Sequence, residues 1–187
     1  MWPMMLGLAA CAEPIVRLLL TDKWLPCVPF LRIFCITYAF YPIHTANLNA
    51  IKAMGRSDLF LKLEIIKKVV SLAVLLITMW FGVMAMAYSL LATTVIYQMI
   101  NAWPNRKLLG YTYEQQIKDI LPSILLAAVM FGIVLSIQFV HLGVVSTLLI
   151  QIPLGIVSYI AGSKLFKLEC YDYVLQTAKG FMKRGIV

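Results

Sequence analysis

The polar side chains that interrupt the apolar sequence gather in one short stretch. It carries His44, Asn47 and Asn49, and two cations, Lys52 and Arg56, follow closely. Imidazole and amide groups in an apolar helix either hydrogen-bond to a neighbouring helix or contact a polar solute, and both interpretations stay open. His44 and Asn47 are three residues apart and share a helical face, whereas Asn49 is turned by about 140° from Asn47. Only part of this group therefore faces one cavity.

A basic turn follows directly. Gly55 permits a tight turn, and Ser57 or Asp58 is suited to cap the next helix. Together with the lysines that come next, Lys52 and Arg56 form a charged face that would attract a diphosphate or another anionic substrate. Alternatively, these cations only fix the orientation of the chain in a membrane. The candidates for a substrate pathway are therefore His44, Asn47, Asn49, Lys52 and Arg56.

Glu13 and Arg17 form a second candidate pair. Because they are four residues apart on a helix, they share a face, and we predict a structural ion pair. Pro14 lacks an amide hydrogen and is expected to kink this helix. Ala-Cys-Ala at residues 10–12 could instead mark a signal-peptide cleavage site. The short preceding segment carries no basic residue, however, and the apolar pattern continues to Leu20, which favours a continuous helix.

No arrangement in the sequence indicates an enzyme active site. No carboxylate lies close to His44 in the sequence, His141 falls in a predicted outer turn, and no nucleotide-binding glycine loop occurs. The four cysteines show no Cys-x-x-Cys pair and no ligand spacing with either histidine. We therefore predict neither catalysis nor a cofactor, and no metal site.

The composition predicts a membrane protein. Of 187 residues, 62% are hydrophobic and 13% are charged, against about a quarter charged in soluble proteins, and the mean hydropathy is +0.89. Short turns at Gly82 and near residue 142 predict two antiparallel hairpins. With roughly 20 residues per spanning helix, we predict an all-α integral membrane protein with six transmembrane helices, at residues 1–20, 27–51, 65–81, 83–103, 121–140 and 143–163.

The net charge of +8 predicts an orientation rather than a nucleic-acid partner. Arg17, Lys23 and Arg32 fall on one side of the predicted membrane, and the other cations fall on the opposite side. By the positive-inside rule that side, which includes the C-terminus, is the cytoplasm. An apolar stripe among the lysines of residues 164–187 predicts a basic amphipathic tail on anionic membrane lipids, with a solvated tail as the alternative. The cytoplasmic cations are Lys52, Arg56, Lys62, Lys67, Lys68, Arg106, Lys107, Lys118, Lys164, Lys167, Lys179, Lys183 and Arg184.

Several short motifs give the chain a family resemblance. They are Thr-Asp-Lys-Trp-Leu-Pro at residues 21–26, Val-Pro-Phe-Leu at 28–31, Tyr-Pro-Ile-His at 41–44, Asn-Leu-Asn at 47–49 and Lys-Ala-Met-Gly-Arg-Ser-Asp at 52–58, continued through 59–68. In these motifs the chain resembles the C-terminal part of the O-antigen, colanic acid and exopolysaccharide flippases. Those proteins belong to the multidrug, oligosaccharidyl-lipid and polysaccharide exporter superfamily. The likeness extends over nearly the whole chain.

The resemblance implies a transporter that flips an undecaprenyl-diphosphate-linked oligosaccharide across the bacterial inner membrane for lipopolysaccharide or exopolysaccharide biosynthesis. Such flippases have roughly 12 to 14 spans in two lobes that alternate access to one site. About eight preceding helices would then be missing, so we expect the chain alone to be inactive and to need the missing N-terminal lobe as a partner. The implied parts are the last four helices of the second lobe at 1–103, a cytoplasmic amphipathic linker at 104–120, a terminal helix pair at 121–163 and the tail at 164–187.

Two other functions stay open. A fragment of a multidrug or cation antiporter of the same superfamily would need an acidic residue in a shielded cavity, and only Glu13 could serve. A small membrane scaffold subunit in a polysaccharide locus would need no such residue.

Overall fold

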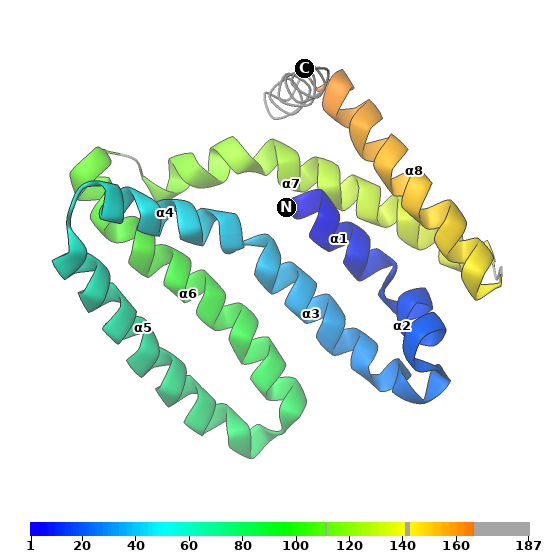
Figure 1. The fold of residues 1–187 in the computed structure, drawn as a ribbon, viewed down its shortest axis with the longest axis horizontal. Coiled ribbons are helices and arrows are strands. Elements are labelled where there is room, and N and C mark those ends of the chain that lie inside the picture. The colour runs from blue at the N-terminus through cyan, green and yellow to red at the C-terminus, as the bar shows by residue number, and fades with distance from the viewer. Residues whose placement is uncertain (111, 141–142, 167–187) are drawn as a thin grey trace, which may run out of the picture.

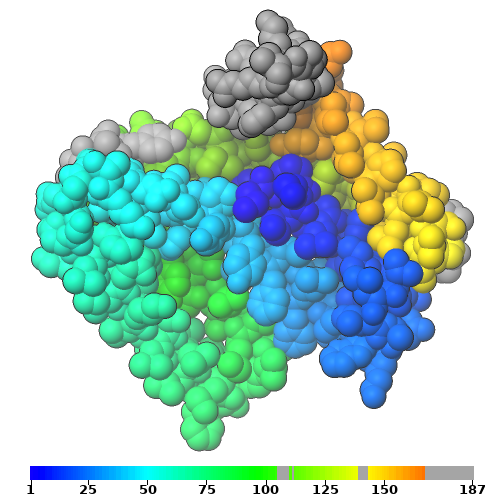
Figure 2. Space-filling model, in the orientation of Figure 1, coloured from blue at the N-terminus to red at the C-terminus, as the bar shows by residue number. Residues whose placement is uncertain are grey.

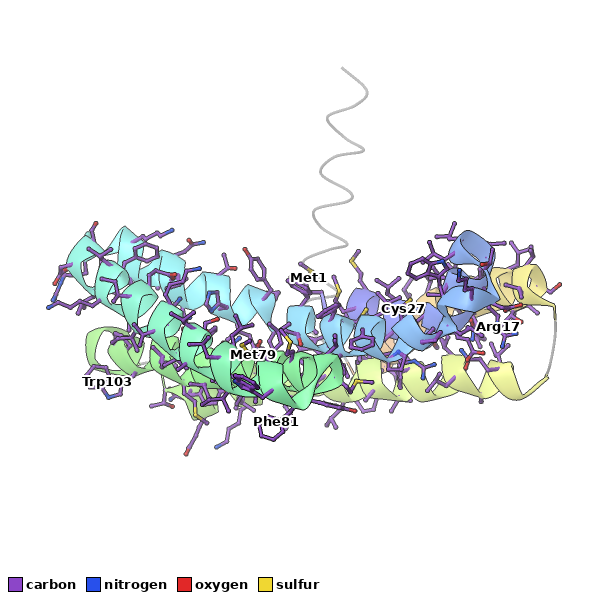
Figure 3. The ribbon with its side chains drawn as sticks, turned by 90° about the horizontal axis from the view of Figure 1, so that it is seen from below. Met1, Arg17, Cys27, Met79, Phe81 and Trp103 are labelled. Carbon is purple, nitrogen blue, oxygen red and sulfur yellow. The ribbon has the colours of Figure 1, made fainter. Side chains whose placement is uncertain are left out.

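The computed structural model describes residues 1–110, 112–140 and 143–166 (Figure 1), and every regular element in these ranges is helical. Seen edge-on, the helices form a flat slab, with α1 to α4 toward one face and α7 toward the other (Figure 3). The elements are α1 (Trp2–Ala10), α2 (Ala12–Leu20), η1 (Asp22–Cys27), α3 (Val28–Ala39), α4 (Tyr41–Ala53), α5 (Ser57–Thr78), η2 (Met79–Phe81), α6 (Val83–Leu109), α7 (Tyr113–Ser136), η3 (Ile137–Val140) and α8 (Val144–Leu165).

Four helical segments are long and apolar enough to cross a membrane. They are Asp22–Ala53, which joins η1, α3 and α4, then Val83–Pro104, Tyr113–Ser136 and Val144–Leu165. The bent pair α1 and α2 makes a fifth if it counts as one span. The prediction of an all-helical chain with several apolar helices, compatible with a multi-pass membrane protein, is therefore confirmed.

The six-span count is not confirmed, and the difference lies in α5. Five charged residues, at positions 58, 62, 64, 67 and 68, fall within the first twelve residues of this helix. The apolar part that remains is shorter than the roughly 20 residues that a bilayer requires. The third predicted span, at residues 65–81, therefore stays a prediction. Its hairpin with the next helix does form, because Gly82 takes a φ of 91° and α5 packs against α6.

The first apolar segment is broken at Cys11, where α1 and α2 meet at an angle of 61°. Pro14 supplies no amide hydrogen, so the carbonyl of Ala10 loses its helical donor. Gln138, in η3 directly after α7, replaces that donor with its side-chain Nε2 at 2.8 Å from the oxygen. Arg32 of α3 likewise donates from Nε to the carbonyl of Ala9 at 3.3 Å. The break thus keeps its backbone oxygens satisfied by side chains from two neighbouring helices.

A second break, at Phe40, divides the next apolar segment into α3 and α4. Pro42 sits in the first turn of α4, where its fixed φ is compatible with a helix start. The carbonyl of Phe40 accepts a hydrogen bond at 2.9 Å from the side chain of Gln98, which α6 carries. A long-range side-chain donor therefore supports this break too.

The bundle is organised around α1, which packs against both α3 and α7. Figure 2 shows α1 in the middle of one face, with α3 and α4 on one side and α8 on the other. Helices α7 and α8 approach closely, since a Cβ atom on Gly162 would lie 2.2 Å from a methyl carbon of Leu126. The apolar core beneath α1 consists of Ala10, Cys11, Met130, Val134 and Leu148.

Residues 104–120, the predicted linker, include the end of α6 and the start of α7. Gly110 ends α6 in the left-handed region, with a φ of 67°. Thr112 and Gln115 then form a capping box at the start of α7. Most of the predicted basic tail lies at residues 167–187, outside the described residues.

We expect Gln138→Leu to lower the free energy of unfolding by about 1–3 kcal/mol, because the Ala10 carbonyl is left without a donor in an apolar interior. In a Pro14→Ala background the restored amide hydrogen at residue 14 supplies that donor. Gln138→Leu should then lower the free energy of unfolding by less than it does in the native background. Unfolding by a denaturing detergent in mixed micelles measures both differences. Equal losses in the two backgrounds would contradict this account of the break.

Candidate functional site

His44, on α4, meets a buried amide on α6. Its Nδ1 lies 2.7 Å from Nδ2 of Asn101, and Asn101 is 0% exposed. The His44 ring is half-buried and stacks near Tyr41, with the ring centres 6.3 Å apart. The first sequence candidate therefore joins two helices at the point where α4 packs against α6.

Asn47, one turn further along α4, reaches a different helix. Its Nδ2 donates to Oε1 of Gln116 on α7 at 2.9 Å, and both side chains are buried. His44 and Asn47 thus share a region of α4 but contact α6 and α7 respectively. Asn49 is exposed and lies outside this region, as its angular position on the helix predicts.

A fourth buried amide, that of Gln98, completes what we call the polar cluster, defined as His44, Asn47, Gln98, Asn101 and Gln116. Gln98 is 1% exposed, and its Nε2 is the donor to the Phe40 carbonyl. Three buried atoms of the cluster have no hydrogen-bond partner within the described part of the chain, namely Gln98 Oε1, Asn101 Oδ1 and Gln116 Nε2. Buried amide atoms are normally paired, so the cluster has unused capacity to bind a donor or an acceptor.

An ion pair on α5 borders the polar cluster. Lys67 is only 5% exposed and pairs with Glu64 one turn earlier. The hydroxyl of Tyr97 on α6 donates to the Lys67 carbonyl at 2.9 Å, which ties α5 to α6. Tyr97 lies one turn before Asn101 on α6, which places this ion pair beside the polar cluster.

Lys52 and Arg56 lie at the surface, around the turn from α4 to α5. The Lys52 ammonium sits 4.5 Å from the centre of the Phe60 ring. The Arg56 guanidinium pairs with Asp58, with an N···O distance of 3.2 Å, and this hydrogen bond lowers the pKa of the Asp58 carboxyl from its usual range. Both cations are exposed and form a basic turn outside the polar cluster.

Glu13 and Arg17 lie at the other end of the molecule, on α2. Arg17 contacts Glu13 at 3.1 Å and Asp22 at 3.7 Å, and all three side chains are substantially exposed. The three groups form a surface network beside the turn into η1. Glu13 therefore does not lie in a shielded cavity.

An apolar groove of about 460 Å³ opens between the two amino-terminal helices and the pair α7 and α8. Gln151 lines it, donates from Nε2 to the Val134 carbonyl at 3.0 Å, and keeps an Oε1 atom without a partner among the described residues. The groove shares no lining residue with the polar cluster. We therefore do not include it in the candidate site.

Three members of the cluster, Gln98, Asn101 and Gln116, are absent from the sequence-based candidates. The sequence contains a pattern that could have identified two of them. Gln98 and Asn101 are three residues apart within an apolar segment, so their amides share one helical face. Gln116 falls in a stretch that the sequence predicts as an amphipathic linker, whereas in the structure its side chain is buried and accepts a hydrogen bond from Asn47 on α4.

No group of His, Cys, Asp and Glu side chains among the described residues is arranged to hold a metal ion. Comparison with known proteins gave no matching family model, no matching curated protein and no matching solved structure.

We expect Asn47→Leu to reduce the free energy of unfolding by about 1–3 kcal/mol, because it leaves Gln116 Oε1 buried and unpaired. Asn49→Leu, the same change on an exposed position of the same helix, should alter it by less than about 0.5 kcal/mol. Reversible unfolding in mixed micelles measures both variants. Similar losses would show that the Asn47 contact does not support the fold.

The Arg56 pair predicts a specific pH effect. Arg56→Ala should raise the Asp58 pKa toward its usual value of about 3.9. Because the folded-state pKa is lowered, the pair stabilises this turn above the unfolded-state pKa, and that contribution is lost as the pH falls through the folded-state value. Carboxyl-carbon NMR follows the titration. Lys68→Ala removes one charge further along α5 and should leave the Asp58 pKa almost unchanged, so an equal rise in both variants would contradict the pairing.

Proposed function

We propose that this chain is the C-terminal part of a flippase that moves an undecaprenyl-diphosphate-linked oligosaccharide across the bacterial inner membrane. The observation that carries the proposal is the polar cluster, which gathers one imidazole and four amides where apolar helices meet. Polar groups among apolar helices are costly in a membrane, and they commonly mark the path of a solute. The sequence motifs at residues 21–68 agree with this assignment.

The chemistry of the cluster suits a sugar. Asn101 Oδ1 and Gln98 Oε1 accept hydrogen bonds, and Gln116 Nε2 donates them, while all three lack a partner among the described residues. A glycan offers hydroxyl groups that both donate and accept, so it can pair with all three atoms. Lys52 and Arg56, at the exposed turn beyond α4, suit a diphosphate, because a guanidinium binds phosphate oxygens in a bidentate manner.

The proposed transporter has further parts. Alternating access requires two repeats that move around a midplane site, so we propose that this chain acts with an N-terminal lobe of the same protein. We also propose six spans, with the C-terminus in the cytoplasm and the tail on anionic lipids, on the basis of the charge distribution.

A cation antiporter is the less supported alternative. Its defining feature would be an acidic side chain in a lipid-shielded cavity. Glu13, the candidate for that role, is exposed and pairs with Arg17. A scaffold subunit would have no use for unpaired amide atoms in its interior.

The proposal predicts the effect of Arg56→Ala on polymer export. The gene is altered and tagged at its own locus, so that one strain reports surface polymer, protein level and product mass. We expect export to fall about tenfold, equivalent to losing about 1.4 kcal/mol of a charge-assisted phosphate contact. The product should be more than twice the 21.1 kDa of this chain.

Lys23→Ala is the matched control, because it removes the same charge from an exposed position in η1, remote in sequence from the basic turn. It should leave export unchanged. Unchanged export in Arg56→Ala at normal protein level would remove the basic turn from the proposal. A stable product of 21.1 kDa would contradict the proposed larger transporter.

A further inference from the structure

The contact between His44 and Asn101 fixes which ring nitrogen carries the proton. Asn101 presents its Nδ2 group to Nδ1 of His44 at 2.7 Å. An amide nitrogen only donates, so Nδ1 must accept. A neutral imidazole has one N–H group, and in this arrangement it is on Nε2. The structure therefore corresponds to a proton-free Nδ1.

The same contact leaves Asn101 incompletely satisfied. Its side chain is 0% exposed, yet Oδ1 has no hydrogen-bond partner in the part of the chain that the structure describes. A buried carbonyl oxygen without a donor is destabilising. The orientation that suits the neutral imidazole thus leaves Asn101 with a buried acceptor that needs a donor.

We propose that His44 and Asn101 form a proton-binding site within the bundle. A proton from water binds the lone pair of Nδ1, and the Asn101 amide turns by half a rotation about its Cβ–Cγ bond. Oδ1 then accepts the new Nδ1–H hydrogen bond. Nδ2 then points away from the ring. Gln98, three residues earlier on the same face of α6, has an Oε1 atom without a partner among the described residues. No other bond is made or broken, and the protein gains one positive charge.

Charged and titratable groups from two helices set the proton affinity of this site. On α5, the buried Lys67 and its partner Glu64 lie beside this part of α6. A positive charge there disfavours a proton on His44, whereas a negative charge favours it. On α6, Tyr97 holds the Lys67 backbone, and on α4 itself Tyr41 stacks near the imidazole. Any movement of α5 that carries Lys67 away favours protonation. Proton binding at His44 is therefore linked to the position of α5.

The site is chemically suited to a proton at physiological pH. An imidazole has an ordinary pKa of about 6.5, nearest to neutrality among side chains. This inference does not depend on which solute the chain transports.

The test is nitrogen NMR of the histidine ring in lipid nanodiscs. The chain has two histidines, so His141→Gln leaves His44 as the single labelled ring. We expect the Nε2–H tautomer at high pH and a doubly protonated ring at low pH. In Asn101→Leu the fixed tautomer should be lost, and in Asn101→Asp the carboxylate should raise the midpoint by about one pH unit or more.

A pair of lysine variants isolates the link to α5. Lys67→Met should raise the His44 midpoint by about one pH unit, because it removes the nearby positive charge. Lys68→Met removes the same charge from the neighbouring, exposed position and should shift the midpoint by less than about 0.3 unit. Circular dichroism verifies that each variant is folded.

Three results would overturn the proposal. They are a His44 ring that stays neutral throughout the titration, an Nδ1–H tautomer at high pH, and equal shifts in the two lysine variants. Because the readout is the protonation of one ring, these results leave the proposed transport function open to its own test.

Discussion

The arrangement of this bundle depends on one constraint: a backbone oxygen that loses its helical donor in apolar surroundings must find another. The chain breaks two apolar segments, at Cys11 and at Phe40. At Cys11 the side chain of Gln138 supplies the donor that the Ala10 carbonyl lacks. At Phe40 the side chain of Gln98 adds a further donor to a carbonyl that already accepts from the backbone amides of Ile43 and His44. The break at Cys11 therefore also determines which helices must be neighbours, because the Ala10 carbonyl needs a donor that another helix carries.

Local sequence features were sufficient to predict the helices. Apolar runs of the right length predicted α8 within two residues and the start of α6, and Pro14 predicted a kink. The helix predicted at 121–140 begins eight residues earlier, at Tyr113, because the predicted linker is partly helical. Whether α5 spans the membrane was harder to predict, because one helix combines a charged first part with an apolar second part. The partners of His44 and Asn47 could not be predicted. They lie 57 and 69 residues away in the sequence, and periodicity within one helix contains no information on which helix will face it.

Gln98 links the two roles of the buried amides. Its nitrogen supports the α3–α4 break, while its oxygen belongs to the polar cluster and has no partner among the described residues. A solute or a proton that repositions this amide would therefore also act on the break, since one side chain cannot turn without moving both of its polar atoms. Structure and proposed function thus share the same hydrogen-bonding groups.

The contact between Gln138 and Ala10 has a consequence for biosynthesis, since its two partners are 128 residues apart. A ribosome adds residues one at a time from the amino terminus, so α1 and α2 leave the exit tunnel long before α7 is made. Until then the Ala10 oxygen must be solvated by water, by the insertion machinery or by a lipid headgroup. The α1–α2 segment is consequently made well before it reaches its final conformation, and the bend at Cys11 matures only when Gln138, which follows α7, arrives.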